Sequence, residues 1–394
     1  MTEQRWPTGI FVACFLLSIG ANAYMLAPAS ILPLLVEQFG VTKTAAGFAI
    51  SAAVLGAVVI QIPGGFLMDR YDNRRLMLAG IAVFGPVAIA GTLFSSYSVF
   101  LAARVVAGLA AGGLFVLGTN VVAEVFAGQR QGFVTTLFIS SAPVGFAVSQ
   151  IAGPSLGAAF GWEAPFIAYP LVATLGYVVF RLSRPSAIRS GQPISVQEFR
   201  AAFHNRAVLL VATAGCCSYL LYIFLNSWMP TYAAAELPLT LSQAGAVTAL
   251  LPAVGVIARP TGGWLSDRLG YRRRAVVIAS FALALPAFVV ISQAISTLLF
   301  AGVMLGVGFS LQFGMGIYYV YARELSAPDV TATSLTIFTT ISFTGTLIAP
   351  PLGGWLVERL SWGPTFFVYI GIGILGILLV ALTPDSSPNA VESR

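Results

Sequence analysis

Long apolar blocks alternate along this chain with short polar or basic segments. Most blocks hold about 20 residues or more, the length that an α-helix needs to cross a hydrocarbon layer of roughly 30 Å. The pattern therefore predicts an all-α membrane protein with twelve transmembrane helices. The expected spans are 10–35, 45–68, 76–94, 98–122, 132–160, 165–182, 207–234, 241–266, 275–293, 297–321, 330–357 and 364–383.

Composition supports a lipid environment. Hydrophobic residues make up 58% of the chain and charged residues 9%, and the mean hydropathy is +0.89. A water-soluble globule of this length would need more polar surface than that. The first apolar block is too long for the core of a signal peptide, so we expect it to be a retained helix.

An internal repeat divides the chain. Residues 65–75 read GFLMDRYDNRR and residues 263–273 read GWLSDRLGYRR, at an offset of 198 positions. This offset predicts two parallel, pseudo-symmetric six-helix bundles, 1–182 and 207–394. The segment 183–206 between them is expected to be a cytoplasmic linker with a short interfacial helix.

Basic residues indicate the orientation. With both termini cytoplasmic, only Lys43 and Arg359 fall in outer loops, as expected for a multi-pass protein of the cytoplasmic (inner) membrane. The formal charge of +6 and the pI of 9.4 then follow from topology, and the expected partner is the lipid bilayer and no nucleic acid.

The repeated motif resembles the signature loop of the major facilitator superfamily, and the resemblance covers the whole chain. It implies a secondary transporter in which these loops latch the cytoplasmic side. In the first copy Asp72 replaces the second glycine, so a looser turn is expected there. The resemblance implies that Asp69 engages the eleventh helix and Arg130, and Asp267 the fifth helix and the Arg323 region. The expected latch residues are Gly65, Asp69, Arg70, Arg74, Arg130, Gly263, Asp267, Arg268, Arg272 and Arg323.

Two arginines lie roughly 10 Å inside the expected membrane, at 1.5 Å per residue. Burying a cation there costs about 3 kcal/mol or more, so Arg104 and Arg259 are the main candidates for substrate binding. Arg104, in RVVAGLAAGG, resembles the fourth-helix motif of the superfamily, which is associated with proton coupling in antiporters. Arg259, in VIARPTGGWLSD, resembles the eighth helix of monocarboxylate and nitrate or nitrite porters, and Gln61 is its partner in the repeat.

No aspartate or glutamate falls in the middle of an expected span. A site with an arginine and no carboxylate is net positive and favours a small organic or inorganic anion, bound between the halves and moved by alternating access. The resemblance places helices one, four, seven and ten around a central cavity. Further candidates for substrate contacts on these helices are Asn22, Tyr24, Asn120, Tyr222, Asn226, Gln312, Tyr318 and Tyr319.

Three functions other than an anion transporter have to be compared with the sequence: a multidrug exporter, a channel and an enzyme. A proton-coupled multidrug exporter is favoured by Arg104 and by GPSLG at 153–157, and disfavoured by the missing carboxylate. A channel would share the composition but not explain the paired latches. An enzyme is not expected, because no catalytic set lies at depth, and no cofactor or metal spacing is present. We expect a monomer, and anion exchange, proton symport and facilitated diffusion all stay open.

Overall fold

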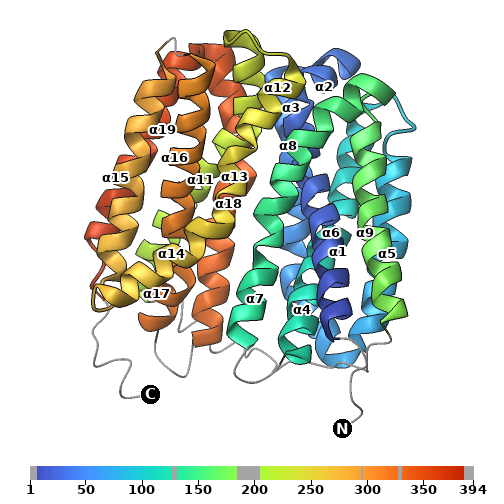
Figure 1. The fold of residues 1–394 in the computed structure, drawn as a ribbon, viewed down its shortest axis with the longest axis horizontal. Helices are drawn as coiled ribbons and strands as arrows, with labels where there is room; N and C mark the ends of the chain where they lie inside the picture. Colours follow the sequence, from blue (N-terminus) through green and yellow to red (C-terminus); the bar gives the residue numbers. More distant parts are fainter. Residues whose placement is uncertain (1–6, 127–130, 184–204, 294–295, 327–330, 386–394) are drawn as a thin grey trace. The chain divides into compact units, whose positions relative to one another are not determined.

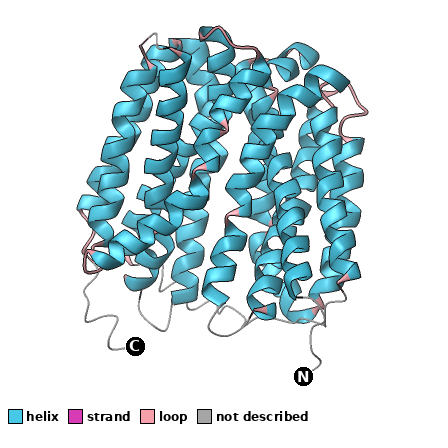
Figure 2. Cartoon of the chain, in the orientation of Figure 1, coloured by secondary structure: helices cyan, strands magenta, loops and turns pink. Residues whose placement is uncertain are grey.

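The computed structural model describes residues 7–126, 131–183, 205–293, 296–326 and 331–385. Within these ranges the chain forms helices and no strands (Figure 2). The helices are α1 (Pro7–Ser30), α2 (Leu32–Phe39), α3 (Lys43–Val59), α4 (Gln61–Arg70), α5 (Asn73–Ala90), α6 (Tyr97–Val125), α7 (Gln131–Ile139), α8 (Ser141–Phe160), α9 (Ala164–Leu182), α11 (Arg206–Glu236), α12 (Leu241–Thr248), α13 (Leu250–Ala253), α14 (Gly255–Arg268), α15 (Arg273–Ile291), α16 (Thr297–Met315), α17 (Tyr318–Glu324), α18 (Thr331–Leu360) and α19 (Trp362–Ala381).

The described helices include eleven segments long and apolar enough to cross a membrane, or up to twelve if the bent pair α2 and α3 counts as one span. The predicted class, an all-helical membrane protein with about twelve spans, is confirmed. The first expected span, 10–35, is divided at Ile31. Pro28 and Pro33 flank Ile31, and proline removes a backbone donor from the helix. Farther along the chain, α2 and α3 are bent by 114° at their junction.

The chain forms two compact units. The first comprises Met1–Pro193 and Leu239–Ala249, and the second comprises Ile194–Pro238 and Leu250–Arg394. The linker expected at 183–206 lies, apart from its ends, outside the described residues.

In the first unit α1 packs against α6, α8 and α9, and α3 packs along α6. Small residues make this close packing possible. A Cβ atom at Gly108 of α6 would overlap the backbone of Ala53 in α3. The Tyr169 hydroxyl then ties α9 to α8 by donating to the Ser149 carbonyl at 3.2 Å.

In the second unit α11 packs against α18 and α19, and α15 lies beside α16 and α19 (Figure 1). The contacts of the first unit recur here. A Cβ atom at Gly308 would overlap the backbone of Leu251, and the Tyr369 hydroxyl donates to the Ala349 carbonyl at 3.2 Å. The repeat seen in the motifs therefore extends to individual packing contacts, at offsets of 198 to 200 positions.

The eighth expected span is broken into three helices. The helical hydrogen-bond pattern is interrupted at Ala249 and Val254, although both residues keep right-handed helical dihedral angles, and these interruptions separate α12 from α13 and α13 from α14. The first piece, α12, packs against α8 in the first unit, where a Cβ atom at Gly245 would overlap the Gln150 carbonyl. The other two pieces, α13 and α14, pack against α16 in the second unit.

Candidate functional site

Arg259 stands in the second turn of α14 and is half-buried. Its Nε atom donates a hydrogen bond to the Gln312 Oε1 atom of α16 at 3.2 Å. Both partners come from the second unit, so the geometry of this contact belongs to one compact body.

Gln312 is fully buried, and its orientation is fixed by the break in the eighth span. The Gln312 Nε2 atom donates to the carbonyls of Leu251 at 2.9 Å and Pro252 at 3.3 Å. Gly255 provides the space, because a Cβ atom there would overlap the Gln312 amide. With its nitrogen committed to two carbonyls, the amide has to present its oxygen to Arg259.

Three tyrosines interact electrostatically with the Arg259 guanidinium, namely Tyr219 and Tyr222 of α11 and Tyr319 of α17. The Tyr222 side chain is 1% exposed, and its hydroxyl lies within reach of the guanidinium but makes no hydrogen bond of normal geometry to any described residue. We call Arg259, Gln312, Tyr219, Tyr222 and Tyr319 the arginine–tyrosine cluster.

No carboxylate forms an ion pair with Arg259 among the residues that the structure describes. The acidic residues in these ranges lie at or within a few residues of helix ends, as Glu124 does in α6 and Glu358 in α18. The arginine–tyrosine cluster therefore carries a net positive charge inside an apolar bundle, where such a charge is costly.

Two further predicted residues of the second unit make backbone hydrogen bonds close to this cluster. The Asn226 Nδ2 atom donates to the Tyr222 carbonyl at 2.8 Å. The Tyr318 hydroxyl donates to the Ala214 carbonyl at 3.4 Å and its ring stacks on Phe338. These contacts hold the backbone of α11 in place beside the cluster.

Arg104 lies in the first unit and is fully buried in α6. Its Nε, Nη1 and Nη2 atoms donate to the carbonyls of Ala49 at 2.7 Å, Tyr24 at 2.9 Å and Met25 at 2.8 Å. The guanidinium also stacks over the Tyr24 ring, at 4.5 Å from its centroid. All three kinds of donor nitrogen are thus occupied by the protein itself.

The sequence of α1 explains one of these acceptors. Pro28 has no backbone N–H, so it cannot donate to the carbonyl four residues earlier, which belongs to Tyr24. An unsatisfied buried carbonyl is costly, and the Arg104 Nη1 atom takes the place of the missing donor. This contact gives Arg104 a role in joining α6 to α1 and α3.

The other candidates of the first unit make local contacts. The Asn22 Nδ2 atom donates to the Ser18 carbonyl at 2.9 Å, and the Asn120 Nδ2 atom donates to the Met68 Sδ atom at 2.9 Å. Gln61 begins α4 and is half-buried. These residues do not belong to the compact unit that holds Arg259.

Next to the predicted latch residues of the second unit, ion pairs form around Arg273. Its Nη1 atom pairs with the Asp267 Oδ1 atom at 2.5 Å, and its Nη2 atom pairs with the Glu324 Oε1 atom at 3.0 Å. Asp267 thus reaches the Arg323 region through Glu324, while Arg323 itself is exposed. Arg268 stacks over the Trp264 ring at 4.4 Å, Arg272 is exposed, and a Cβ atom at Gly263 would meet no atom within 4 Å.

The two copies of the motif turn differently. In the second copy Gly270 adopts the left-handed conformation at φ 71°, which suits glycine. In the first copy Asp72 stands at that position and caps α5, accepting from the Arg74 backbone at 3.0 Å and pairing with the Arg74 side chain at 2.6 Å. Arg70 is exposed. Arg130 lies outside the described residues, and the burial of Gly65 and Asp69 is likewise not described.

Glu324→Gln is expected to destabilise the second unit, because the Arg273 side chain, only 6% exposed, would keep a single ionised partner. Hydrogen bonds to charged groups contribute about 1.5–3 kcal/mol each, so unfolding should require roughly that much less free energy. Thermal unfolding in detergent would measure the change. Glu236→Gln, at the exposed end of α11, is the matched control. Equal melting of the Glu324 variant and the control would contradict the assignment.

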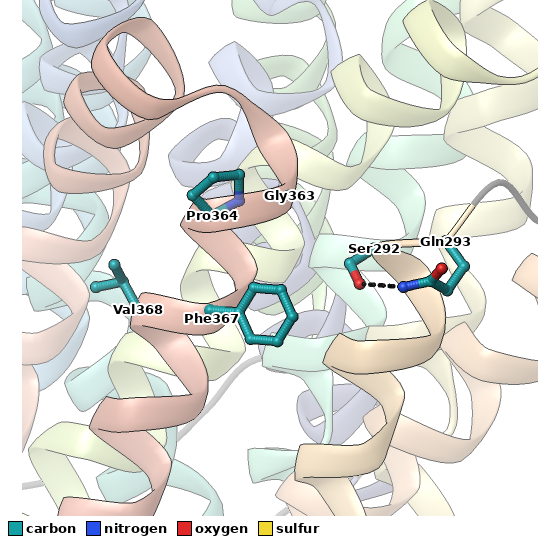
Figure 3. Close-up of a pocket in the computed structure, with 6 residues that line it drawn as sticks. All are labelled: Ser292, Gln293, Gly363, Pro364, Phe367 and Val368. Atoms are coloured by element: carbon teal, nitrogen blue, oxygen red, sulfur yellow. Dashed lines mark hydrogen bonds between the residues drawn. The ribbon is translucent and has the colours of Figure 1, made fainter.

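A separate shallow pocket lies where α15 ends and α19 begins (Figure 3). None of its lining residues is charged, and the Gln293 Nε2 atom donates to the Ser292 Oγ atom at 3.2 Å. The lining residues are Ser292, Gln293, Gly363, Pro364, Phe367 and Val368. This pocket includes no member of the arginine–tyrosine cluster.

Three residues of the described sites were not predicted as site residues from the sequence. Tyr219 precedes Tyr222 by three positions and Asn226 by seven, a spacing that places all three on one helix face. Arg273 closes the repeated motif, and Glu324 lies three residues beyond the tenth expected span, 297–321. Helical periodicity could therefore have found Tyr219, whereas the pairing of Arg273 with Glu324 required the fold.

An all-helical, twice-repeated bundle with about twelve spans and a cation inside one half has the architecture of a secondary transporter. Residues 10–345 match the Major Facilitator Superfamily, and the chain belongs to this superfamily. The relatives are themselves transporters, and the predicted family is confirmed.

Three similar proteins illustrate the range of transporters that this chain resembles. The probable sulfoacetate transporter SauU of Cupriavidus necator is 24% identical over 387 residues, covering 90% of this chain and 89% of the relative. The proline/betaine transporter of Salmonella typhimurium is 24% identical over 351 residues, covering 80% and 69%. A crystal structure of a mutant of the nucleoside transporter NupG shares the fold, with a TM-score of 0.81, 12% identity and coverage of 95% and 99%.

Proposed function

We propose that this secondary transporter carries a small anion, and that Arg259 binds its charge. The observation that carries the proposal is the half-buried Arg259 guanidinium, which has a neutral amide as its hydrogen-bond partner and no carboxylate among the described residues. A cation held in an apolar bundle without a counter-charge attracts an anion.

The proposed mechanism is alternating access by a monomer in the cytoplasmic membrane, with both termini cytoplasmic. A bound anion would neutralise Arg259, and the neutral complex would meet a smaller electrostatic barrier when the site closes to water. Exchange against a counter-anion and symport with protons are both compatible with this scheme. The placement of arginines in the loops of one side supports the orientation.

The relatives support a small solute without selecting its charge. One is named for sulfoacetate and another for proline and betaine. The charge of the substrate therefore rests on the arginine–tyrosine cluster.

One of the two sequence features that favoured a multidrug exporter no longer supports it. Arg104, which favoured it, donates to three backbone carbonyls and has no exposed surface. A lipophilic cation would also have to approach Arg259 with no carboxylate of the described spans to attract it. We therefore propose the anion porter.

Uptake into proteoliposomes tests the proposal. Labelled anions of several shapes, including lactate, formate, oxalate, nitrate, cyanate and benzoate, would be compared with labelled proline as a zwitterion and with a lipophilic cation. We expect saturable uptake of at least one anion, and an imposed proton gradient or internal anion would identify the coupling. Transport of the cation or of proline with no anion moving would refute the proposal.

A further inference from the structure

The arginine–tyrosine cluster provides one available positive charge. Arg104, the other arginine predicted at depth, is held by carbonyls in the other compact unit. The charge balance at Arg259 is therefore +1, and a second negative charge on a ligand would stay uncompensated in an apolar surrounding.

The hydrogen-bonding pattern leaves one edge of Arg259 free. Gln312 Oε1 accepts from Nε, while Nη1 and Nη2 make no hydrogen bond of normal geometry to any residue within the described ranges. Two terminal guanidinium nitrogens form the edge that pairs side by side with two oxygens of a carboxylate or sulfonate. The buried Tyr222 hydroxyl beside this edge is also without a hydrogen-bond partner there.

Two of the tyrosines that interact electrostatically with this guanidinium also pack against phenylalanine rings. Tyr219 packs edge-on against Phe343 at 5.1 Å between ring centroids, and Tyr319 packs edge-on against Phe338 at 5.2 Å. Tyr219 is half-buried and the Tyr319 side chain is 44% exposed, so both rings keep surface that no described residue covers. Ring surface of this kind gains free energy by contact with an apolar or aromatic body.

From these three observations we infer that the cluster binds an organic monoanion with a flat apolar body, its carboxylate or sulfonate paired with Arg259 and accepting a hydrogen bond from Tyr222. The rings of Tyr219 and Tyr319 contact the body of the ligand. This inference rests on the proposed function and narrows it, since nitrate has no apolar body and a dianion such as oxalate exceeds the available charge.

Binding to the purified full-length protein tests the inference apart from transport. Benzenesulfonate is the probe, because it stays charged at all working pH values and does not cross lipid as a neutral acid. Its dissociation constant would be measured by calorimetry in detergent beside benzene-1,3-disulfonate, nitrate and the neutral benzenesulfonamide. We expect benzenesulfonate to bind at least tenfold more tightly than each of the other three.

Two variants assign the contacts. Tyr222→Phe removes only the hydroxyl and is expected to weaken benzenesulfonate binding roughly tenfold, as for a lost hydrogen bond to a charged group. Tyr219→Leu is expected to weaken benzenesulfonate binding more than nitrate binding, which lowers the preference for benzenesulfonate over nitrate. Tyr177→Phe, in the other compact unit, is the matched control and should bind like the wild type.

The outcomes separate this inference from the proposed function. If nitrate or the disulfonate binds as tightly as benzenesulfonate, the substrate class is overturned and the anion porter stands. If none of the anions binds and none is taken up by proteoliposomes, the proposed function itself fails. If benzenesulfonate binds equally well to Tyr222→Phe and to the wild type, the assigned contact with Tyr222 is wrong.

Discussion

Arg259→Ala is expected to lower anion uptake roughly 100-fold, because removing one partner of a desolvated, hydrogen-bonded charge pair costs about 2–5 kcal/mol. The same substitution should leave thermal stability without substrate unchanged or slightly higher. The reason is that the guanidinium has no ionic partner among the described residues, so its removal relieves an uncompensated charge. Initial uptake rates in proteoliposomes and melting in detergent would measure the two effects.

Arg259→Lys separates charge from geometry. Lysine keeps the positive charge but lacks the planar edge that pairs with two oxygens, so we expect uptake to fall roughly tenfold rather than 100-fold. Arg181→Ala, at the exposed end of α9, is the control for loss of an arginine as such. Full uptake by Arg259→Ala would exclude Arg259 as the anion-binding group.

Arg104→Leu is expected to lower the thermal stability of the protein, in contrast to Arg259→Ala. The substitution leaves the carbonyls of Ala49, Tyr24 and Met25 without their side-chain donor in a fully buried setting. We expect a loss of about 1–3 kcal/mol in unfolding free energy, the cost of leaving the buried Tyr24 carbonyl without any donor. Thermal unfolding and the yield of monodisperse protein would report it.

Arg104→Lys serves as the conservative comparison, since one ammonium group cannot reach three carbonyls in the same arrangement as a guanidinium. It should melt between the wild type and Arg104→Leu. A variant Arg104→Leu that melts like the wild type but no longer transports would show instead that Arg104 acts on the substrate.

The twelve spans and the repeat were predictable because both follow from one-dimensional patterns. Apolar length sets the number of crossings, and the copies at 65–75 and 263–273 sit at a fixed offset. The structure adds that this offset holds for side-chain contacts, as between Tyr169 with Ser149 and Tyr369 with Ala349.

Depth alone could not distinguish Arg104 from Arg259. Both arginines lie well inside the expected spans, but Arg104 donates to carbonyls of α1 and α3, whereas Arg259 donates to Gln312 and interacts electrostatically with tyrosines. The difference depends on which helices pack around each position, which periodicity does not specify. Pro28 was the available signal, because a proline inside α1 leaves the Tyr24 carbonyl without its helical donor.

The latch illustrates a similar limit. The motif identifies Asp267 and its arginines, but the partner of Arg273 is Glu324, 51 positions along the chain. Only the packing of α15 near α17 brings these charges together.

The interrupted eighth span also contains the boundary between the two compact units. Its first helix α12 belongs to the first unit, and α13 and α14 belong to the second, so the boundary falls between Ala249 and Leu250. Gln312 ties Arg259 to the carbonyls of Leu251 and Pro252, the residues that directly follow this boundary. A ligand that binds Arg259 would therefore be linked through Gln312 to the first residues of the second unit.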